Sequence, residues 1–243
     1  MLLDGRIVVW FSSGAASACA LKLMAPFKPL AVNCDVTLDE HSDNVRFKRE
    51  VQEWTGVEIH TIGSKQFWSI EEVFEKKKYM AGIKGAPCTV EMKKVPRFSF
   101  QKPDDIHVFG YTADEEKRVK EFESSNPELL LFWPLVRARM TKQDCFSMLQ
   151  EAGISRPEIY NLGFPNANCI GCVKASSPKY WNMVRKNFPE IFQRRCLQSR
   201  KFGAKLCRVK GLRIYLDELP IDENESIQED LSCGPQCSLN PHT

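Results

Sequence analysis

Short hydrophobic runs alternate with stretches of helical periodicity through the first half of the chain. The apolar runs predict strands at residues 6–11, 29–34, 58–62 and 106–111, and the periodic stretches predict helices at 18–24, 43–55, 69–80, 90–100 and 114–124. Strands separated by helices of this length are typical of βαβ units with right-handed crossovers. The pattern therefore predicts an α/β fold with a Rossmann-like parallel sheet and helices on both of its faces.

The pattern changes after about residue 130. A short apolar run at 129–133 favours one more strand, and a helix is expected at 141–152 between a threonine cap and Gly153. Turn residues, two cysteine pairs and a basic helical stretch at 178–201 follow, and the acidic segment 217–230 is typical of a solvated linker. We therefore expect a sheet domain at 1–140 and a smaller cysteine-bearing region at 141–243.

The composition is that of an ordinary globular protein and excludes collagen-like, mucin-like and wholly disordered chains. The 243 residues are 43% hydrophobic and 27% charged. The apolar run at 7–11 is far shorter than the ~20 residues that cross a bilayer, so we expect no membrane segment and a cytoplasmic location. The net charge of +3 neither requires nor excludes a nucleic acid partner.

A turn of small residues joins the first predicted strand to the first helix. It comprises Ser12, Ser13, Gly14, Ala15, Ala16 and Ser17. Such a turn places backbone N–H groups at a helix N-terminus, where a phosphate or sulfate binds well. Close packing alone also explains it. The dinucleotide-binding and Walker patterns are both absent.

Asp35 directly follows the second predicted strand. A carboxylate at the carboxyl end of a parallel strand is well placed to hold a ribose or a base. The acidic residues Asp39 and Glu40 come soon afterwards and allow a second interpretation, a solvated loop that leads into the helix at residue 43.

The chain has ten cysteines, which in a reducing compartment serve as core residues, metal ligands or redox groups. Cys169 and Cys172 form a C-x-x-C pair, and Cys233 and Cys237 form a second close pair. Two such pairs can ligate zinc or an iron–sulfur cluster. A zinc site without chemistry and a redox dithiol are the alternatives. The more isolated cysteines, Cys19, Cys34, Cys145, Cys196 and Cys207, are expected to be packing residues.

Cations recur in three clusters along the chain. They are Lys93, Lys94 and Arg97, then Lys117 and Arg118, then Arg137 and Arg139. Each cluster is explained either as a solvated helix face or as part of a ring of anion clamps around a nucleotide.

Taken together, the motifs resemble, in chain order from about residue 7 to 237, those of the phosphoadenosine phosphosulfate reductase family. This family is related to the ATP pyrophosphatases of the PP-loop, adenine nucleotide alpha-hydrolase-like superfamily. The turn at 12–17 resembles the family's S-G-G-x-x-S phosphate loop; Asp35 with residues 40–47 resembles its second-strand block; residues 87–96 resemble its C-T-x-x-x-K-x-x-P block; residues 110–118 resemble a later strand-to-helix motif; residues 157–172 resemble the segment entering its cysteine knuckle.

The resemblance implies an enzyme of sulfur metabolism whose residues 1–140 bind an adenylyl nucleotide as substrate. The implied nucleotide contacts are Ser12, Ser13, Gly14, Ala15, Ser17, Asp35, Lys93, Gly110 and Arg118. A thiolate attacks the sulfur in such reductases, which implies Cys233 as nucleophile and Cys237 as resolving thiol or metal ligand. A thioredoxin-like protein would be the reductant, and a homo-oligomer is compatible with the resemblance.

Two departures from the family keep other functions open. Ala15 and Ala16 stand where the pyrophosphatase branch has Lys and Asp, which favours the reductase side. Cys88 with Cys169 and Cys172 would give three ligands to a [4Fe–4S] cluster, an arrangement resembling sulfur-inserting tRNA thiolases, whereas Cys169, Cys172, Cys233 and Cys237 would give a closed zinc or cluster site. An ATP-dependent sulfur transferase that acts on a nucleic acid through the basic stretch 178–201 is therefore one alternative, and a non-catalytic nucleotide- or cluster-sensing module is another.

Overall fold

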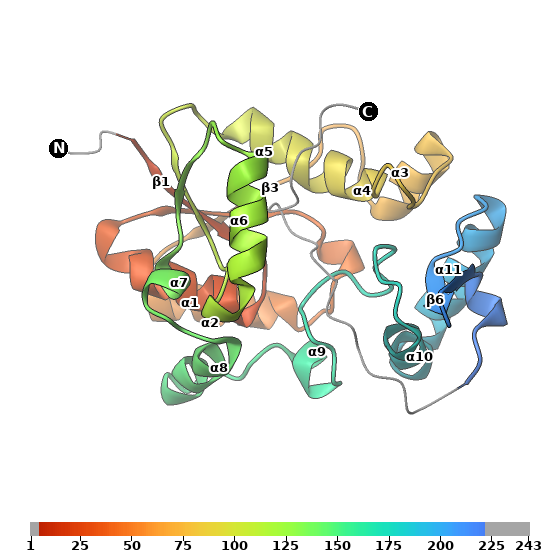
Figure 1. The fold of residues 1–243 in the computed structure, drawn as a ribbon. Coiled ribbons are helices and arrows are strands. Elements are labelled where there is room, and N and C mark those ends of the chain that lie inside the picture. Colours follow the sequence, from red (N-terminus) through yellow and green to blue (C-terminus); the bar gives the residue numbers. More distant parts are fainter. Residues whose placement is uncertain (1–4, 222–243) are drawn as a thin grey trace.

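A five-stranded parallel sheet forms the centre of the molecule, as the sequence predicts (Figure 1). The computed structural model describes residues 5–221. The strands are β1 (Ile7–Phe11), β2 (Leu30–Cys34), β3 (Ile59–Ile62), β4 (Ile106–Phe109) and β5 (Leu130–Phe132). They lie in the order β3-β2-β1-β4-β5, and every neighbouring pair is parallel. This is an α/β, Rossmann-like fold.

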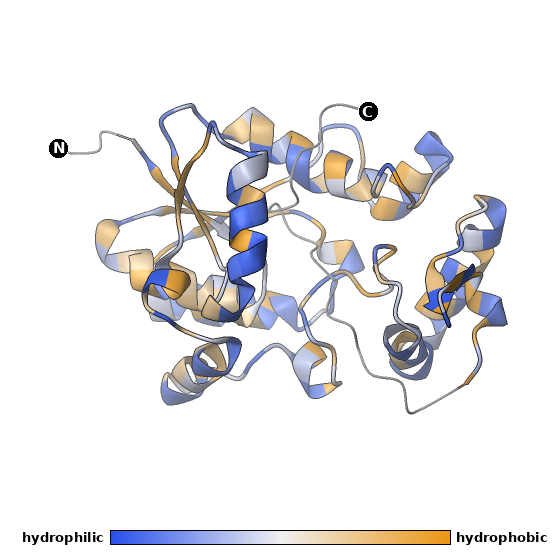
Figure 2. Ribbon diagram, in the orientation of Figure 1, coloured by the Kyte–Doolittle hydropathy of each residue, from blue (hydrophilic) through white to orange (hydrophobic). Residues whose placement is uncertain are grey.

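Both faces of the sheet are buried because side chains alternate along each strand. On one face, Val9 and Phe11 pack with α1 (Ala15–Met24), α2 (Asn44–Thr55) and α8 (Lys142–Glu151). On the other face, Val8 and Trp10 pack with α5 (Val95–Phe100) and α6 (Glu116–Ser125). Figure 2 shows hydrophobic strands behind a largely hydrophilic α6, which exposes its polar side. Helices therefore cover both faces, as expected.

The strand order creates a switch point between β1 and β4. The chain runs outward from β1 to β2 and β3, then returns to the other side of β1 as β4 and continues to β5. The connections after β1 and after β4 consequently leave the sheet in opposite directions. Ligands of open α/β sheets bind at the carboxyl ends of strands at such a point.

A second hydrophobic core lies beside the sheet. Its elements are α3 (Ile70–Lys77), α4 (Pro87–Thr89) with the π-helical turn Val90–Lys94, α9 (Glu158–Asn161), α10 (Pro178–Asn187), α11 (Pro189–Lys201) and the hairpin β6 (Cys207–Val209) and β7 (Leu212–Ile214). This core takes residues from both sides of position 140, and the sheet's own core extends to Cys145, Leu149 and Ile154. The C-terminal region thus packs on the segment between β3 and β4.

Several elements differ from the sequence expectation for local physical reasons. The basic stretch at 178–201 is two helices, because Pro189 has no N–H to continue the first one and begins the second. The β6–β7 hairpin was not predicted; its strands have three residues each. The start of the acidic linker expected at 217–230 is not a solvated chain, since residues 216–218 form a 3₁₀ turn and Leu219 is buried.

A search of the helices between residues 5 and 221 finds none with both the length and the apolar character needed to cross a membrane.

His107 on β4 makes the stability of the sheet depend on pH. Trp10 Nε1 donates to His107 Nδ1 at 3.0 Å, and burial lowers the pKa of His107 from 6.5 to about 4. Between these values the unfolded chain binds a proton that the folded chain excludes, so the free energy of unfolding falls as pH drops from 6.5 to 4, by up to roughly 3 kcal/mol.

His107→Gln keeps an acceptor for the indole but does not titrate. We expect the free energy of unfolding of this variant to decrease less between pH 6.5 and 4 than that of the wild type. Urea titration at several pH values measures both. The exposed His60 provides the control, because His60→Gln should keep the wild-type slope. Parallel curves for His107→Gln and the wild type would contradict this account.

Candidate functional site

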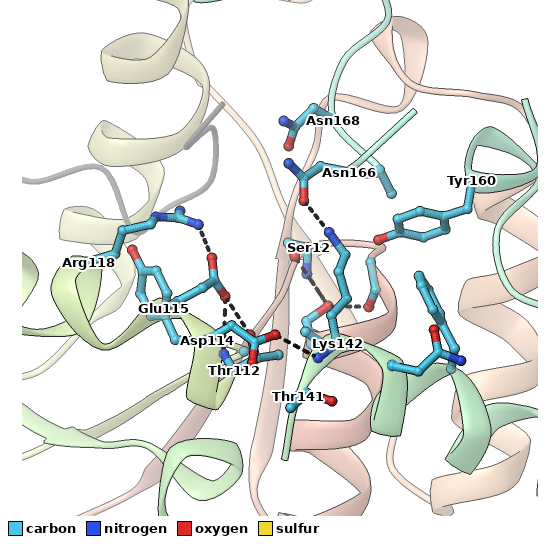
Figure 3. Close-up of a pocket in the computed structure, with 18 residues that line it drawn as sticks. Ser12, Thr112, Asp114, Glu115, Arg118, Thr141, Lys142, Tyr160, Asn166 and Asn168 are labelled. Carbon is cyan, nitrogen blue, oxygen red and sulfur yellow. Dashed lines mark hydrogen bonds and ion pairs between the residues drawn. The ribbon is translucent and has the colours of Figure 1, made fainter. Parts of the chain in front are cut away.

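A pocket of about 500 Å³ opens at the switch point of the sheet (Figure 3). The pocket is lined by three segments, and a helix begins at each of them. These segments are the turn after β1, the turn after β4 and the first residues of α8. Residues of the 160–168 segment, which leads to Cys169, close the remaining side. The pocket therefore joins the sheet domain to the approach of the cysteine pair.

Hydrogen bonds of Ser17 close the turn after β1 on itself. Ser17 Oγ accepts from the backbone N–H of Ser12 at 3.1 Å and donates to the carbonyl of Gly14 at 2.8 Å. Ser12 Oγ lies 3.2 Å from the same hydroxyl. Ser13 has a φ of +58°, in the left-handed region that favours glycine. These contacts hold the turn in a curved shape at the N-terminus of α1, a position where backbone N–H groups can bind an anion.

Gly110 brings the end of β4 against the first turn of α1. A Cβ at this position would lie 2.6 Å from Ser17 N and 2.7 Å from Ser17 Cα, both backbone atoms. Only glycine therefore allows this approach. It sets the width of the pocket between the two loops.

Lys142, Tyr160 and Asn166 form the opposite wall. Lys142 Nζ donates to the carbonyl of Pro165 and to Asn166 Oδ1, the latter at 2.9 Å, and lies 5.7 Å from the centroid of the Tyr160 ring. The Tyr160 hydroxyl accepts from the backbone N–H of Ala15 at 3.4 Å, and burial raises its pKa to about 12. Tyr160 is thus a neutral hydrogen-bonding link between the serine turn after β1 and the 160–168 segment.

The third wall begins at the end of β4 and contains both carboxylates of the pocket. Glu115 accepts from the N–H of Thr112 at 3.1 Å and forms an ion pair with Arg118. The Arg118 guanidinium lies 4.8 Å from the centroid of the Tyr111 ring. Asp114 Oδ2 accepts from the backbone N–H of Lys142 at 3.3 Å, which ties this wall to α8.

The structure brings five of the predicted nucleotide contacts to the lining of this pocket: Ser12, Gly14, Ser17, Gly110 and Arg118. Ser13 and Ala15 belong to the same turn but do not line the pocket.

Asp35 and Lys93 lie away from the pocket lining. Asp35 is exposed and accepts from the N–H and hydroxyl of Thr37, at 3.2 and 2.9 Å. Lys93 is buried in the second core region, where its carbonyl accepts from the Cys34 thiol at 3.6 Å. The reason is topological: β2 lies on the far side of β1 from β4, so its carboxyl end does not border the switch point.

Sequence reasoning did not single out Lys142, Asn166 or Tyr160 as pocket residues. The sequence does contain a signal for Lys142, because Thr141 and Asp144 form a capping box that fixes the start of α8 beside it. The partners of Lys142 lie 23 and 24 residues further on, a separation that local pattern cannot bridge.

The Cys169–Cys172 turn is buried and anchored on both sides. The Tyr180 hydroxyl accepts from the N–H of Cys172 at 2.8 Å, and Arg195 Nε donates to the carbonyl of Gly171 at 3.1 Å. Gly171 has a φ of +66°, and a Cβ there would lie 2.9 Å from Ile191. Glycine is therefore required in the middle of this turn.

No group of three or more His, Cys, Asp or Glu side chains that could hold a metal ion is present among residues 5–221. In this part of the chain Cys88 is thus not joined to Cys169 and Cys172 in a three-ligand group. Cys233 and Cys237 lie outside the described residues, so the four-cysteine site and the tail nucleophile stay predictions.

Three other thiols are poor nucleophiles at neutral pH. A hydrogen bond to Cys145, with burial, raises the pKa of Cys19. Burial raises the pKa of Cys34 and of Cys196 to about 11. Thiolate is the reactive form of cysteine, so these residues serve packing, as expected from the sequence.

No family model matches the sequence, and no curated protein matches it closely enough to count as a relative. Among solved structures the chain is similar to the phosphoadenylyl-sulfate (PAPS) reductase from Candida auris, in its phosphate complex. The TM-score is 0.50 at 13% identity, over 69% of this chain and 83% of that one. A likeness at this identity is one of fold. The chain therefore has the PAPS reductase-like α/β fold that its motifs predict.

Proposed function

We propose that this protein is a PAPS reductase-like enzyme that binds an adenylyl nucleotide in the switch-point pocket and transfers or reduces its activated sulfur. The observation that carries the proposal is the closed serine turn at the N-terminus of α1, which lines a pocket of about 500 Å³. Such a pocket is large enough for a nucleotide. The motif resemblance and the fold point to the same ligand class.

The turn would bind the phosphate or sulfate end of the nucleotide. Ser12 and Ser17 provide hydroxyls, and the first turn of α1 provides backbone N–H groups with the positive end of the helix dipole. Thr112 and Asn168, which also line the pocket, provide neutral polar groups for the remainder of the ligand.

The sulfur step of the proposed reaction uses thiol chemistry. The Cys233 thiolate attacks the sulfate sulfur, an S–S bond forms, and the S–O bond breaks with release of the adenosine phosphate. The Cys237 thiolate then attacks Cys233 Sγ, which releases sulfite and leaves a disulfide, and a thioredoxin-like dithiol reduces that disulfide. Zinc or an iron–sulfur cluster held by Cys169 and Cys172 with further thiolates would hold the knuckle rigid beside the pocket.

Nucleic acid modification is less well supported by the geometry. Most cations of the basic stretch are bound within the molecule: Arg194 and Arg195 to Glu71, Arg200 to Asp217 and Glu218, Lys201 to Glu75, and Arg185 to the carbonyl of Leu219. Charges paired in this way contribute little to a phosphate-binding surface. We therefore favour a free nucleotide as the substrate.

Ser17→Ala should weaken nucleotide binding, because it removes the hydroxyl that closes the turn. The loss of the three neutral hydrogen bonds of this hydroxyl, two to Ser12 and one to the carbonyl of Gly14, predicts about tenfold weaker affinity. Isothermal titration calorimetry with ATP, adenylylsulfate and phosphoadenylylsulfate measures it. Ser147→Ala, at an exposed serine of α8 outside the pocket, should bind like the wild type. Failure of the wild type to bind any of the three nucleotides would refute the proposed function.

Cys233→Ser separates the chemistry of the tail from metal binding. The proposed mechanism predicts loss of sulfite release from the preferred sulfonucleotide with unchanged zinc and iron content, since the nucleophile is removed and the ligands remain. Sulfite assay and metal analysis of anaerobically purified protein measure the two quantities. Loss of metal together with activity would instead make Cys233 a ligand, and full activity would exclude it as the nucleophile.

A further inference from the structure

The β6–β7 hairpin and the residues just before it carry a group of exposed cations. These are Lys205, Arg208, Lys210 and Arg213, and the segment 205–213 contains no acidic residue. Figure 1 shows the hairpin with α10 and α11, at the opposite end of the molecule from α7. None of these residues lines the switch-point pocket. The hairpin is therefore a separate, positively charged surface.

The register of the hairpin places two arginines side by side. Arg208 on β6 lies directly opposite Arg213 on β7. Side chains alternate along a strand, so both arginines project from the face opposite to Cys207, which is fully buried. Like charges directly opposite each other in an antiparallel pair are destabilising. An anion bound to both guanidinium groups would relieve this repulsion.

Carboxylates do not neutralise this surface within residues 5–221. The ion pairs formed in that part of the chain include none with Lys205, Arg208, Lys210 or Arg213. Asp217 and Glu218, which follow the hairpin, bind Arg200 instead. The Arg213 guanidinium donates to two neutral carbonyls, those of Lys205 at 3.3 Å and Leu206 at 3.4 Å. The hairpin thus presents positive charge where the basic helices before it present paired charge.

The hairpin is anchored to the second core, so its cations have a fixed backbone. The N–H of Arg208 donates to the carbonyl of Ser176 at 2.8 Å. Leu206 and Cys207 are buried in that core, and Ile214 packs against it. A surface held in this way loses little conformational freedom when it binds a partner.

The composition of the hairpin favours a nucleic acid over a protein partner. Protein interfaces are built around an apolar, aromatic-rich centre, whereas Leu212 is the one large exposed hydrophobic residue of 205–214. Phosphate contacts depend mainly on arginine and lysine. Residues 205–213 include no aromatic side chain that could stack on an unpaired base. The major groove of B-DNA admits a two-stranded β-ribbon, so these features fit duplex DNA.

We propose that the β6–β7 hairpin is a docking surface for duplex DNA. Lys205, Arg208, Lys210 and Arg213 bind its phosphates, and the opposed arginines form the centre of the surface. The proposal goes beyond the proposed function. DNA bound at the hairpin is a partner and not the substrate of the pocket, so docking there does not depend on whether the pocket binds a nucleotide.

The double variant Arg208→Gln with Arg213→Gln should bind a fluorescein-labelled DNA duplex of about 20 bp roughly 10- to 100-fold more weakly than the wild type at about 50 mM salt. Its log affinity should also fall less steeply with log salt concentration, by a slope difference of about 2, because each phosphate contact contributes about 0.9. Fluorescence anisotropy measures both quantities. Lys205→Gln with Lys210→Gln, which keeps both arginines, should weaken binding in the same way.

Two further variants separate the surface from net charge and from structure. Lys117→Gln with Lys120→Gln removes the same charge from exposed positions of α6 and should bind like the wild type. Arg208→Lys with Arg213→Lys keeps the charge and should retain most of the affinity. Equal weakening by the α6 variant, or complete loss of binding in the lysine variant, would contradict the proposal.

The choice of partner is tested with the wild type. A dissociation constant above about 100 µM for the duplex at about 50 mM salt would be weaker than ordinary non-specific DNA binding and would overturn the proposal. Tighter binding of an RNA duplex of the same sequence would also overturn the choice of DNA. Displacement of the labelled duplex by polyglutamate at lower concentration than by unlabelled duplex would assign the surface to an acidic protein partner instead.

Discussion

The approach of Gly110 to the first turn of α1 is the constraint on which the pocket depends. Because a Cβ would meet the backbone of Ser17 at 2.6 Å, any side chain would force β4 and α1 apart. The same contact sets the distance between the two loops of the switch point, and both loops line the pocket. The strand order of the sheet thus fixes where the serine turn and the β4 loop meet. In open α/β sheets this is the point where ligands bind.

A second set of contacts connects the loop after β2 and helix α3 to the cysteine-bearing region. Arg195, which is 1% exposed, donates to Glu71 of α3 at 2.8 Å and to the carbonyl of Gly171. The carbonyl of Asp39, in the loop after β2, accepts from the N–H of Ile170 at 2.8 Å. Burial beside Glu71 raises the pKa of the Asp39 carboxyl to about 7. The cysteine turn is therefore fixed by groups from three separate segments, and such a satisfied buried network makes the turn rigid.

The sheet could be predicted from the sequence because each central strand buries both faces, which leaves a near-continuous hydrophobic run such as that of β1. The serine turn could also be found, since small residues between strand and helix form a local pattern. Strand order depends on contacts distant in sequence, and without it the sequence does not indicate that Lys142 lines the switch-point pocket and that Asp35 lies away from it. The β6–β7 hairpin could not be predicted. Arg208, Leu212 and Arg213 are exposed, so its strands show no alternation of apolar and polar residues.

Three local features at or beside the pocket depart from the usual rules of backbone conformation, helix electrostatics and burial. Between residues 5 and 221, five non-glycine residues have positive φ. Four of them, Lys28, Lys78, Arg139 and Lys210, follow helices or occupy a hairpin turn, where such a conformation is common. Ser13 is the exception, since it precedes a helix inside the serine turn. Lys142 begins a helix against the dipole, and the buried hydroxyl of Tyr160 occupies an amide of the loop. Local costs of this kind are often found at functional sites, and here all three lie at or beside the cavity of the switch point.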